Sequence, residues 1–218
     1  SNATGWGLFC DMQDAGESFS GKTIVLAGEI GTTEDPVTRM GSSTTQFQGT
    51  FDGAGHTLTV QYGTPSEPVD QQFVAPFPVV EGAATFRNLP IAGSIYSGYD
   101  TSVDKGTGGL IGCLFGGVTV EHCVSTVTVN AASDRAGGFV GLCEHAVTFT
   151  DCVSSATVTC TGSGSGFVGW SRDSNYTIAF YGCLFNGKVL KKNGVGSGNG
   201  GFVGWKGYHK TVKITNCL

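Results

Sequence analysis

The sequence predicts an all-β protein, a single-stranded right-handed parallel β-helix with a short helix capping its N-terminus. Two patterns favour this solenoid: a glycine-framed motif recurs at nearly constant spacing, and apolar residues between its copies alternate in short runs. The composition agrees, because the 218 residues include 36 glycines and only 13% are charged, against about 25% in an average soluble protein. Glycine without a three-residue period excludes collagen, and 39% hydrophobic residues exclude a disordered chain.

The repeat is a four-residue motif followed by a β-rich stretch and a cysteine. Its copies occupy residues 109–112, 138–141, 166–169 and 201–204, and they read Gly-Leu-Ile-Gly once and Gly-Phe-Val-Gly three times. The cysteines that follow are Cys123, Cys152, Cys183 and Cys217. A degenerate earlier copy starts at Ala75 and places Leu89 at the cysteine position. Repeats of this size indicate one structural unit stacked on the next.

Each repeat has room for three short strands. Apolar residues alternate in runs such as Val118 and Val120, and this period of two is typical of strands. A unit of about 28 residues with three strands matches one coil of a parallel β-helix. The blades of a β-propeller run about 40 residues, and a β-sandwich needs no repeat, so both fit less well. The longest inserts, at residues 97–107, 171–176 and 191–199, are the loops expected to carry function.

The chain divides into three parts. Residues 1–3 resemble the scar of a cleaved expression tag. Residues 4–21 form the predicted cap, with Thr4 as the N-cap of a helix that ends near Gly16. Residues 22–218 form the coils, which we expect to be a fragment of a longer protein. No cap is evident at the C-terminus, where we expect an end-to-end contact because open strand edges invite pairing.

Charge and hydropathy limit the partners. The net charge is −5, and the only adjacent cations are Lys191 and Lys192, so nucleic acid is not an expected partner. No apolar run reaches the roughly 20 residues that a membrane-spanning helix needs, so we expect no membrane insertion.

Three segments of the N-terminal third resemble a known family. They are Trp6 with Phe9, the string Ser-Phe-Ser-Gly-Lys-Thr-Ile-Val-Leu at 18–26, and Phe-Gln-Gly-Thr-Phe-Asp-Gly-Ala-Gly-His-Thr-Leu at 47–58. This opening is similar to that of GLUG-motif-type surface proteins of bacteria, and the Asn-Leu at 88–89 and Asn-Cys at 216–217 match their coil ends. The chain departs from that pattern at His122 and Gly182, where asparagine is usual, and at 75–78, which reads Ala-Pro-Phe-Pro. The resemblance implies a secreted, wall-attached, adhesin-like bacterial module and implies no reaction or cofactor.

The eight cysteines are predicted to be mainly free thiols. Four occupy one repeat position, so they should stack as an interior ladder with parallel side chains, which a disulfide does not favour. At least one bridge remains an alternative, with Cys113 and Cys143 as the most plausible pair. Zinc-type ligand spacings are absent from the sequence, so no metal site is expected.

The most enzyme-like string is interpreted as a turn. Asp52 and His56 could share a proton, but Asp followed by Gly is typical of a turn. We therefore predict that Asp52, Gly53, Gly55 and His56 form a structural turn, with Gly53 at positive φ and His56 opening a strand. Glu121 and Asp151 are the only acids near one repeat position, which is too few for glycosidase or lyase chemistry.

Loop aromatics are the predicted contact residues. Trp170 and Trp205 share one repeat position, directly after the Gly-Phe-Val-Gly motif, so the two indoles should lie one coil apart. Aromatic faces beside polar groups can hold sugar rings, and close packing against the turns is the alternative. The predicted ligand-binding residues are Tyr99, Trp170, Arg172, Tyr176, Trp205 and Tyr208, with Asp173 and His209 beside them. The predicted function is non-enzymatic surface display or adhesion toward a glycan or a host surface protein; the alternatives are a polysaccharide-active enzyme and a purely structural stalk.

Overall fold

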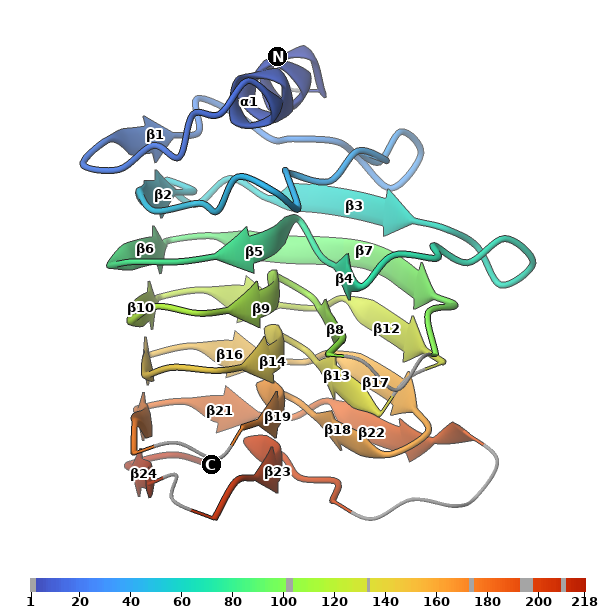
Figure 1. The fold of residues 1–218 in the computed structure, drawn as a ribbon, viewed down its shortest axis with the longest axis vertical. Coiled ribbons are helices and arrows are strands. Elements are labelled where there is room, and N and C mark those ends of the chain that lie inside the picture. Colours follow the sequence, from blue (N-terminus) through green and yellow to red (C-terminus); the bar gives the residue numbers. More distant parts are fainter. Residues whose placement is uncertain (1–2, 101–103, 133, 173–174, 193–197, 209–210) are drawn as a thin grey trace.

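The protein is a β-solenoid of about six turns with a helix at its N-terminal end. The computed structural model describes residues 3–100, 104–132, 134–172, 175–192, 198–208 and 211–218. Figure 1 shows the coils stacked along the long axis, with α1 (Ala3–Asp14) across one end. Every strand pairing among the described residues is parallel, which confirms the predicted fold class.

Four parallel sheets run along the solenoid. Sheet 1 holds β1 (Thr23–Val25), β2 (Thr50–Asp52), β6 (Ala84–Arg87), β10 (Val118–Glu121), β15 (Val147–Thr150), β20 (Thr177–Tyr181) and β24 (Thr211–Thr215). Sheet 2 holds β21 (Leu184–Phe185), β16 (Val153–Ser154), β11 (Val124–Ser125), β7 (Pro90–Ser97), β12 (Thr128–Ala131), β17 (Thr157–Cys160) and β22 (Lys188–Lys191), with β3 (Leu58–Tyr62) paired to β7. Sheet 3 holds β18 (Ser163–Ser165), β13 (Arg135–Gly137), β8 (Gly106–Gly108) and β4 (Phe73–Val74). Sheet 4 holds β23 (Val203–Lys206), β19 (Val168–Ser171), β14 (Val140–Cys143), β9 (Ile111–Leu114) and β5 (Phe77–Val80).

The pairing register confirms the sequence repeat, including its degenerate copy. Phe77 pairs with Ile111, which lays Ala75 on Gly109, and Phe86 pairs with Val120 as the alignment requires. Equivalent residues of successive coils therefore stack. In the interior, the rings of Phe149 and Phe180 lie 5.2 Å apart at an interplanar angle of 6°. The core is thus a column of like side chains, and the alternating apolar residues face it.

The first glycine of the first two motif copies is required by close approach between coils. A Cβ added to Gly109 would lie 2.0 Å from the carbonyl oxygen of Gly138, and one added to Gly138 would lie 2.1 Å from that of Gly166. Since real Cβ atoms essentially never approach an atom closer than 3.0 Å, any side chain here would push two coils apart. This packing constraint accounts for glycine at these two positions.

The corner before each ladder residue adopts a left-handed conformation. Positive φ angles of 50° to 62° occur at equivalent places in five coils, at Asn88, His122, Asp151, Gly182 and Asn216. Glycine tolerates this region best, and asparagine, aspartate and histidine adopt it more often than other residues do. The departures from asparagine noted in the sequence therefore keep the same backbone corner.

The ladder cysteines lie where the repeat predicts. Cys123, Cys152 and Cys183 are buried in the interior beside Leu89, and Cys217 is half-buried in the last coil. Each of the four thiols donates to the carbonyl oxygen two residues earlier, at 3.2–3.4 Å. A neighbouring-thiol contact and burial raise the pKa of Cys152 to about 12. The Cys152 thiol is consequently a poor nucleophile.

All eight cysteines are free thiols in the structure. Cys113 pairs in register with Leu142, whereas Cys143 pairs with Leu114, so the two cysteines are offset by one residue. Cys143 belongs to the interior core and Cys113 to a separate outer cluster. The pair singled out from the sequence thus points to opposite sides of sheet 4, which corrects the idea that it could form a bridge.

The N-terminal cap covers the first coil. Trp6, Phe9, Cys10 and Gln13 are the buried residues of α1. Thr4 lies inside the helix, which begins at Ala3, so the predicted N-cap is wrong by at least one residue. Gly16 has a φ of 96° and donates to the carbonyl of Gln13 at 2.9 Å, which ends the helix as expected. Within the described residues no helix is long and apolar enough to cross a membrane.

Candidate binding surface around the stacked tryptophans

Two tryptophans stack on the outside of sheet 4. Trp170 on β19 pairs in register with Trp205 on β23, and their rings lie 5.2 Å apart at 14°. Both side chains are half-buried. The prediction that the two indoles occupy one repeat position in neighbouring coils is confirmed.

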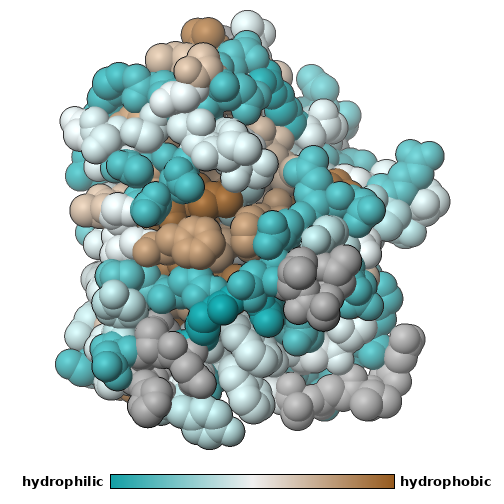
Figure 2. All heavy atoms as spheres, viewed as in Figure 1, coloured by the Kyte–Doolittle hydropathy of each residue, from teal (hydrophilic) through white to brown (hydrophobic). Residues whose placement is uncertain are grey.

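The tryptophans continue an apolar strip that lies apart from the interior core. Leu142, Cys113 and Val79 precede them at the same place on sheet 4. With Phe73 of sheet 3 these residues form a second buried cluster, against which Trp170 packs. Figure 2 shows a hydrophobic patch on this face of the molecule, with hydrophilic side chains below it. The sequence analysis missed this strip because Cys113 and Leu142 read as ordinary core residues.

A network of ion pairs adjoins the tryptophans. Asp104 accepts hydrogen bonds from Arg135, at 2.9 Å, and forms an ion pair with Arg172. Arg172 also donates to Glu144 at 2.7 Å. The Arg135 guanidinium lies 4.8 Å from the centre of the Trp170 ring, within the range of a cation–π interaction. Trp170 is therefore held between a guanidinium and a second indole.

The network fixes the charge state of its central carboxylate. The Arg172 guanidinium lowers the pKa of Asp104. Desolvation acts in the opposite direction, and the hydrogen bond from Arg135 lowers the pKa further. The contact with Asp104 in turn raises the pKa of Arg172. Asp104 is consequently an anion at neutral pH, which suits hydrogen-bond acceptance and not proton donation.

A cavity of about 210 Å³ opens between these groups. Asp104, Arg135, Trp170, Ser171, Arg172, Trp205 and Gly207 line it. Three of the six predicted ligand-binding residues, Trp170, Arg172 and Trp205, thus meet at one place.

The other three predicted residues lie elsewhere. Tyr99 lines a separate cavity of about 420 Å³ with Phe73 and polar residues of earlier coils. The Tyr176 ring lies 3.6 Å from that of His145, and Tyr208 is 83% exposed. Neither of them lines the cavity beside the tryptophans. Asp173 and His209 fall outside the described residues.

The sequence analysis overlooked Arg135 and Glu144, although a signal for one of them exists. Cys143 pairs with Ser171, so Glu144 and Arg172 are neighbours in adjacent coils. Opposite charges one repeat apart therefore mark this ion pair in the sequence. Arg135 comes from sheet 3, and only the bend between sheets 3 and 4 brings it over Trp170.

The segment around Asp52 forms a turn in the structure. Asp52 accepts from the N–H of Ala54 at 2.9 Å and from Arg87 at 2.8 Å, whereas His56 lies 3.5 Å from Glu29. Desolvation opposes ionisation of Asp52, but these hydrogen bonds prevail and lower its pKa.

Two details of that predicted turn are wrong. Positive φ occurs at Ala54 and Gly55, not at Gly53, whose added Cβ would lie 2.4 Å from the carbonyl of Asn88. Gly53 is thus needed for coil packing. His56 precedes β3 by two residues and does not open the strand.

The acids near the ladder do not form a catalytic pair. Asp151 occupies the left-handed corner, and its Oδ2 lies 3.7 Å from Nε2 of His122. Glu121 lies at the end of β10 opposite Thr150. Among the described residues no group of three His, Cys, Asp or Glu side chains could hold a metal ion.

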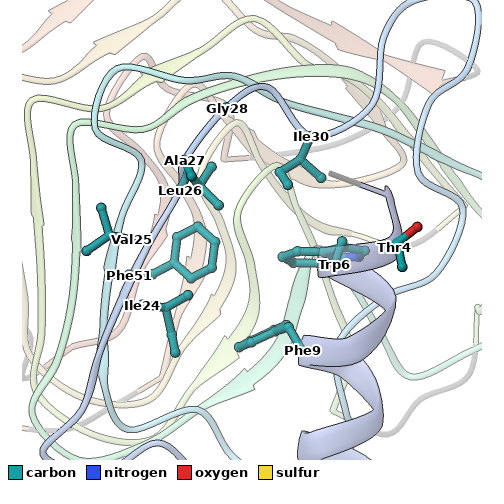
Figure 3. Close-up of a pocket in the computed structure, with 11 residues that line it drawn as sticks. Thr4, Trp6, Phe9, Ile24, Val25, Leu26, Ala27, Gly28, Ile30 and Phe51 are labelled. Atoms are coloured by element: carbon teal, nitrogen blue, oxygen red, sulfur yellow. The ribbon is translucent and has the colours of Figure 1, made fainter. Parts of the chain in front are cut away.

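A cavity of about 580 Å³ lies at the N-terminal end between α1 and the first coil. Figure 3 shows Trp6 and Phe9 of the helix facing Phe51 and the segment from Ile24 to Ile30 across it. Its lining side chains are apolar apart from Thr4, so it offers a surface for hydrophobic contact rather than for chemistry.

The chain was compared with protein-family models, with characterised proteins and with solved structures. None of the three comparisons gives a match.

Proposed function

We propose that this solenoid is a non-enzymatic binding module of a bacterial cell surface, and that it holds a saccharide at the cavity beside Trp170 and Trp205. The observation that carries the proposal is the stacked indole pair next to the ion-paired Asp104 and Arg172. Flat apolar sugar faces stack on indole rings, and their hydroxyl groups pair with carboxylates and guanidinium groups.

The arrangement of the rings favours Trp205 for the stacking role. One face of Trp170 meets Arg135, at 4.8 Å, and the other meets Trp205, at 5.2 Å. Since both faces of Trp170 are occupied, a sugar ring would use the face of Trp205 that is turned away from Trp170. Trp170 and Arg135 then act as positioning residues that hold the Trp205 ring.

The electrostatics favour binding over hydrolysis. A glycosidase needs a carboxyl group whose pKa is raised so that it can donate a proton. Asp104 has a lowered pKa because Arg172 and Arg135 stabilise its anion. The rigid network fits a polar binding wall better than an acid catalyst.

The proposed surface setting rests on the resemblance to GLUG-motif-type proteins described above. The stacked coils support a display role, because a solenoid is a stiff rod that presents its side loops away from an attachment point. A stalk without a ligand is the competing interpretation, and the binding experiment separates the two.

The test is binding of the purified domain to a panel of glycans, mucin and host matrix proteins. A Trp205→Ala variant should lose at least tenfold in affinity for the best ligand, and Trp205→Phe should retain part of it. Tyr208→Ala is the matched control, because Tyr208 is an exposed aromatic of the same coil and does not line the cavity. Circular dichroism of each variant verifies that the fold is kept.

Three results would contradict the proposal. Equal affinity of the wild type and the folded Trp205→Ala variant would move the site elsewhere. Absence of binding across the whole panel would favour the stalk. Release of reducing ends from a polysaccharide, abolished in Asp104→Asn or Glu144→Gln, would instead identify an enzyme.

A further inference from the structure

Two cavities on the surface of the first coils join into one polar cleft. The cavity of about 420 Å³ that contains Tyr99 shares Ser43, Thr44 and Gln71 with a cavity of about 490 Å³ that residues 38–44 mainly line. Because the same side chains line both cavities, the two form one continuous hollow, which we call the polar cleft. Its lining is rich in hydroxyl and carboxamide groups, and the half-buried ring of Tyr99 adds an aromatic face.

The polar groups of this cleft have hydrogen-bonding capacity to spare. Within the described part of the chain, the side chains of Ser43, Gln71 and Tyr99 form no hydrogen bond. Ser43 and Gln71 are also exposed. A hydroxyl group and a carboxamide beside an aromatic ring match the hydroxyl groups and flat apolar faces of sugars. The polar cleft therefore suits the same class of ligand as the cavity beside the tryptophans.

Exposed aromatic side chains lead from the polar cleft toward the tryptophans. Phe73 lines the cleft together with Tyr99. The Phe73 ring lies 6.5 Å from the ring of Phe115, which follows β9 and is 43% exposed. Sheets 3 and 4 lie on the side turned toward the viewer in Figure 1, and Figure 2 shows exposed hydrophobic side chains midway along this face. The aromatic surface thus continues beyond the cleft.

Phe115 in turn adjoins the ion-pair network. The pairing of β9 with β14 places Phe115 one coil before Glu144. Glu144 accepts a hydrogen bond from Arg172 at 2.7 Å, and Arg172 lines the cavity beside the tryptophans. A second link runs from Gln72 of the polar cleft, which donates to the backbone carbonyl of Asp104. These contacts join the cleft and the tryptophan cavity into one surface along sheets 3 and 4, which we call the aromatic track. Its aromatic members are Tyr99, Phe73, Phe115, Trp170 and Trp205.

The aromatic track is too long for a small sugar to cover. Three register steps on sheet 4 separate Trp170 from Val79, which packs in one cluster with Phe73. Neighbouring parallel strands lie about 4.8 Å apart, so these three steps span about 14 Å. One more step leads to Trp205. A disaccharide at Trp205 would leave the polar cleft empty, whereas a longer chain would reach it.

Two unpaired acids lie beside the track. Asp70 lines the polar cleft, and the pairing of β5 with β9 places Glu81 one coil before Phe115. Both side chains are exposed, and neither forms an ion pair with the described residues. The carboxylates and guanidinium groups of the network, by contrast, neutralise one another. Bringing uronate or sulfate groups close to two carboxylates would cost free energy, so the charges favour an uncharged ligand.

We propose that the ligand of this surface is an uncharged polysaccharide chain that lies along the aromatic track, with one part at Trp205 and another in the polar cleft. This inference rests on the proposed saccharide function and extends it from one cavity to a chain. Two subsites that hold the same chain act together, because binding at the first raises the effective concentration at the second. Tyr99 then contacts the ligand at the subsite remote from the tryptophans.

The experiment is isothermal titration calorimetry of the whole chain with disaccharides and hexasaccharides of the gluco-, xylo- and manno-series. The readout is the ratio of the two affinities within one series. The hexasaccharide of the best series should bind about tenfold or more tightly than its disaccharide, because only the longer chain reaches both subsites. Hexagalacturonate, which is anionic, should bind more weakly than the best uncharged hexasaccharide.

Variants locate the two subsites. Phe115→Ala and the double variant Gln71→Ala/Tyr99→Ala should each bring the ratio close to one, whereas Trp205→Ala should lower both affinities. Tyr181→Ala is the matched control, because Tyr181 is a 40% exposed aromatic residue on sheet 1, away from the track. It should keep the ratio of the wild type. Circular dichroism verifies that each variant is folded.

Four outcomes would overturn the inference. Equal affinities for the disaccharide and the hexasaccharide, both lost in Trp205→Ala, would confine the ligand to one cavity and leave the proposed function intact. A length dependence that Phe115→Ala and Gln71→Ala/Tyr99→Ala leave unchanged would place the additional sugars elsewhere. Tighter binding of hexagalacturonate than of every uncharged hexasaccharide would refute the uncharged chain. Absence of binding by every saccharide tested would contradict the proposed function as well.

Discussion

Replacing Gly138 by alanine tests the packing argument for the glycine repeat. Gly138 opens the second motif copy, and an added Cβ would lie 2.1 Å from the carbonyl oxygen of Gly166. It would also lie 2.8 Å from Ala156 Cβ and from Ser154 Oγ. Because the closest of these atoms belongs to the backbone, the coils must separate by about 1 Å to admit the methyl group.

The magnitude follows from the hydrogen bonds that this separation stretches. The Gly138 N–H donates to the carbonyl of Ser165 at 2.9 Å, and Ser154 Oγ donates to that of Gly166 at 2.6 Å. A shift of about 1 Å would weaken both, and each buried bond contributes roughly 1 kcal/mol, with a further penalty for groups left unpaired. We expect the free energy of unfolding to fall by about 3 kcal/mol.

Urea denaturation followed by far-ultraviolet circular dichroism measures this loss. Gly117→Ala is the matched control, because the nearest atom to its added Cβ is His145 Nδ1, at 4.0 Å. That variant should be neutral or slightly stabilised, since alanine restricts the unfolded chain by about 0.4–1 kcal/mol. Equal unfolding midpoints for the two variants would refute the close-approach argument.

Three further predictions concern the turn, the interior and the thiols. Asp52→Ala should lower the unfolding free energy by about 1–2 kcal/mol at neutral pH, because contacts with Arg87 are lost. Folding lowers the pKa of Asp52, so its carboxylate contributes to the free energy of unfolding above the unfolded pKa of about 3.9. This contribution is lost as pH falls through the lower native pKa. The stabilities of the wild type and the variant should therefore converge in acid-denaturation titrations. Ser154→Ala should lower the free energy of unfolding by about 1–3 kcal/mol in thermal denaturation, because the carbonyl of Gly166 loses a buried hydrogen-bond donor at 2.6 Å. Thr148→Ala, at a half-buried strand position, is the control and should lower it much less. Ellman's reagent should detect eight thiols in the denatured chain. In the folded protein it should react slowly with the buried Cys152 thiol. A count below eight in the denatured chain without reductant would show a disulfide.

The fold was predictable because each of its determinants is local and repeated. The spacing of the motif from Gly109 onward gives the coil length, and the alternation of Val118 and Val120 gives the strands. Even the degenerate copy at Ala75 fell into register, because stacking forces equivalent residues of neighbouring coils into contact.

The structure brings only part of the predicted contact residues together. Trp170, Arg172 and Trp205 converge, because the repeat itself stacks the two indoles and places Arg172 two residues after Trp170. Tyr99 and Tyr208 lie elsewhere. Loop lengths differ between coils, so proximity in the sequence to an insert says little about where a loop side chain lies.

The sequence by itself determined the all-β solenoid, the cap, the cysteine ladder and the stacking of Trp170 on Trp205. These features follow from a one-dimensional repeat in which each coil contacts its neighbours in the same register. Only the tertiary structure decided that Arg135 covers Trp170 and that Cys113 leaves the interior. Those arrangements depend on the bends between sheets, where residues from different strands meet without any repeat to relate them.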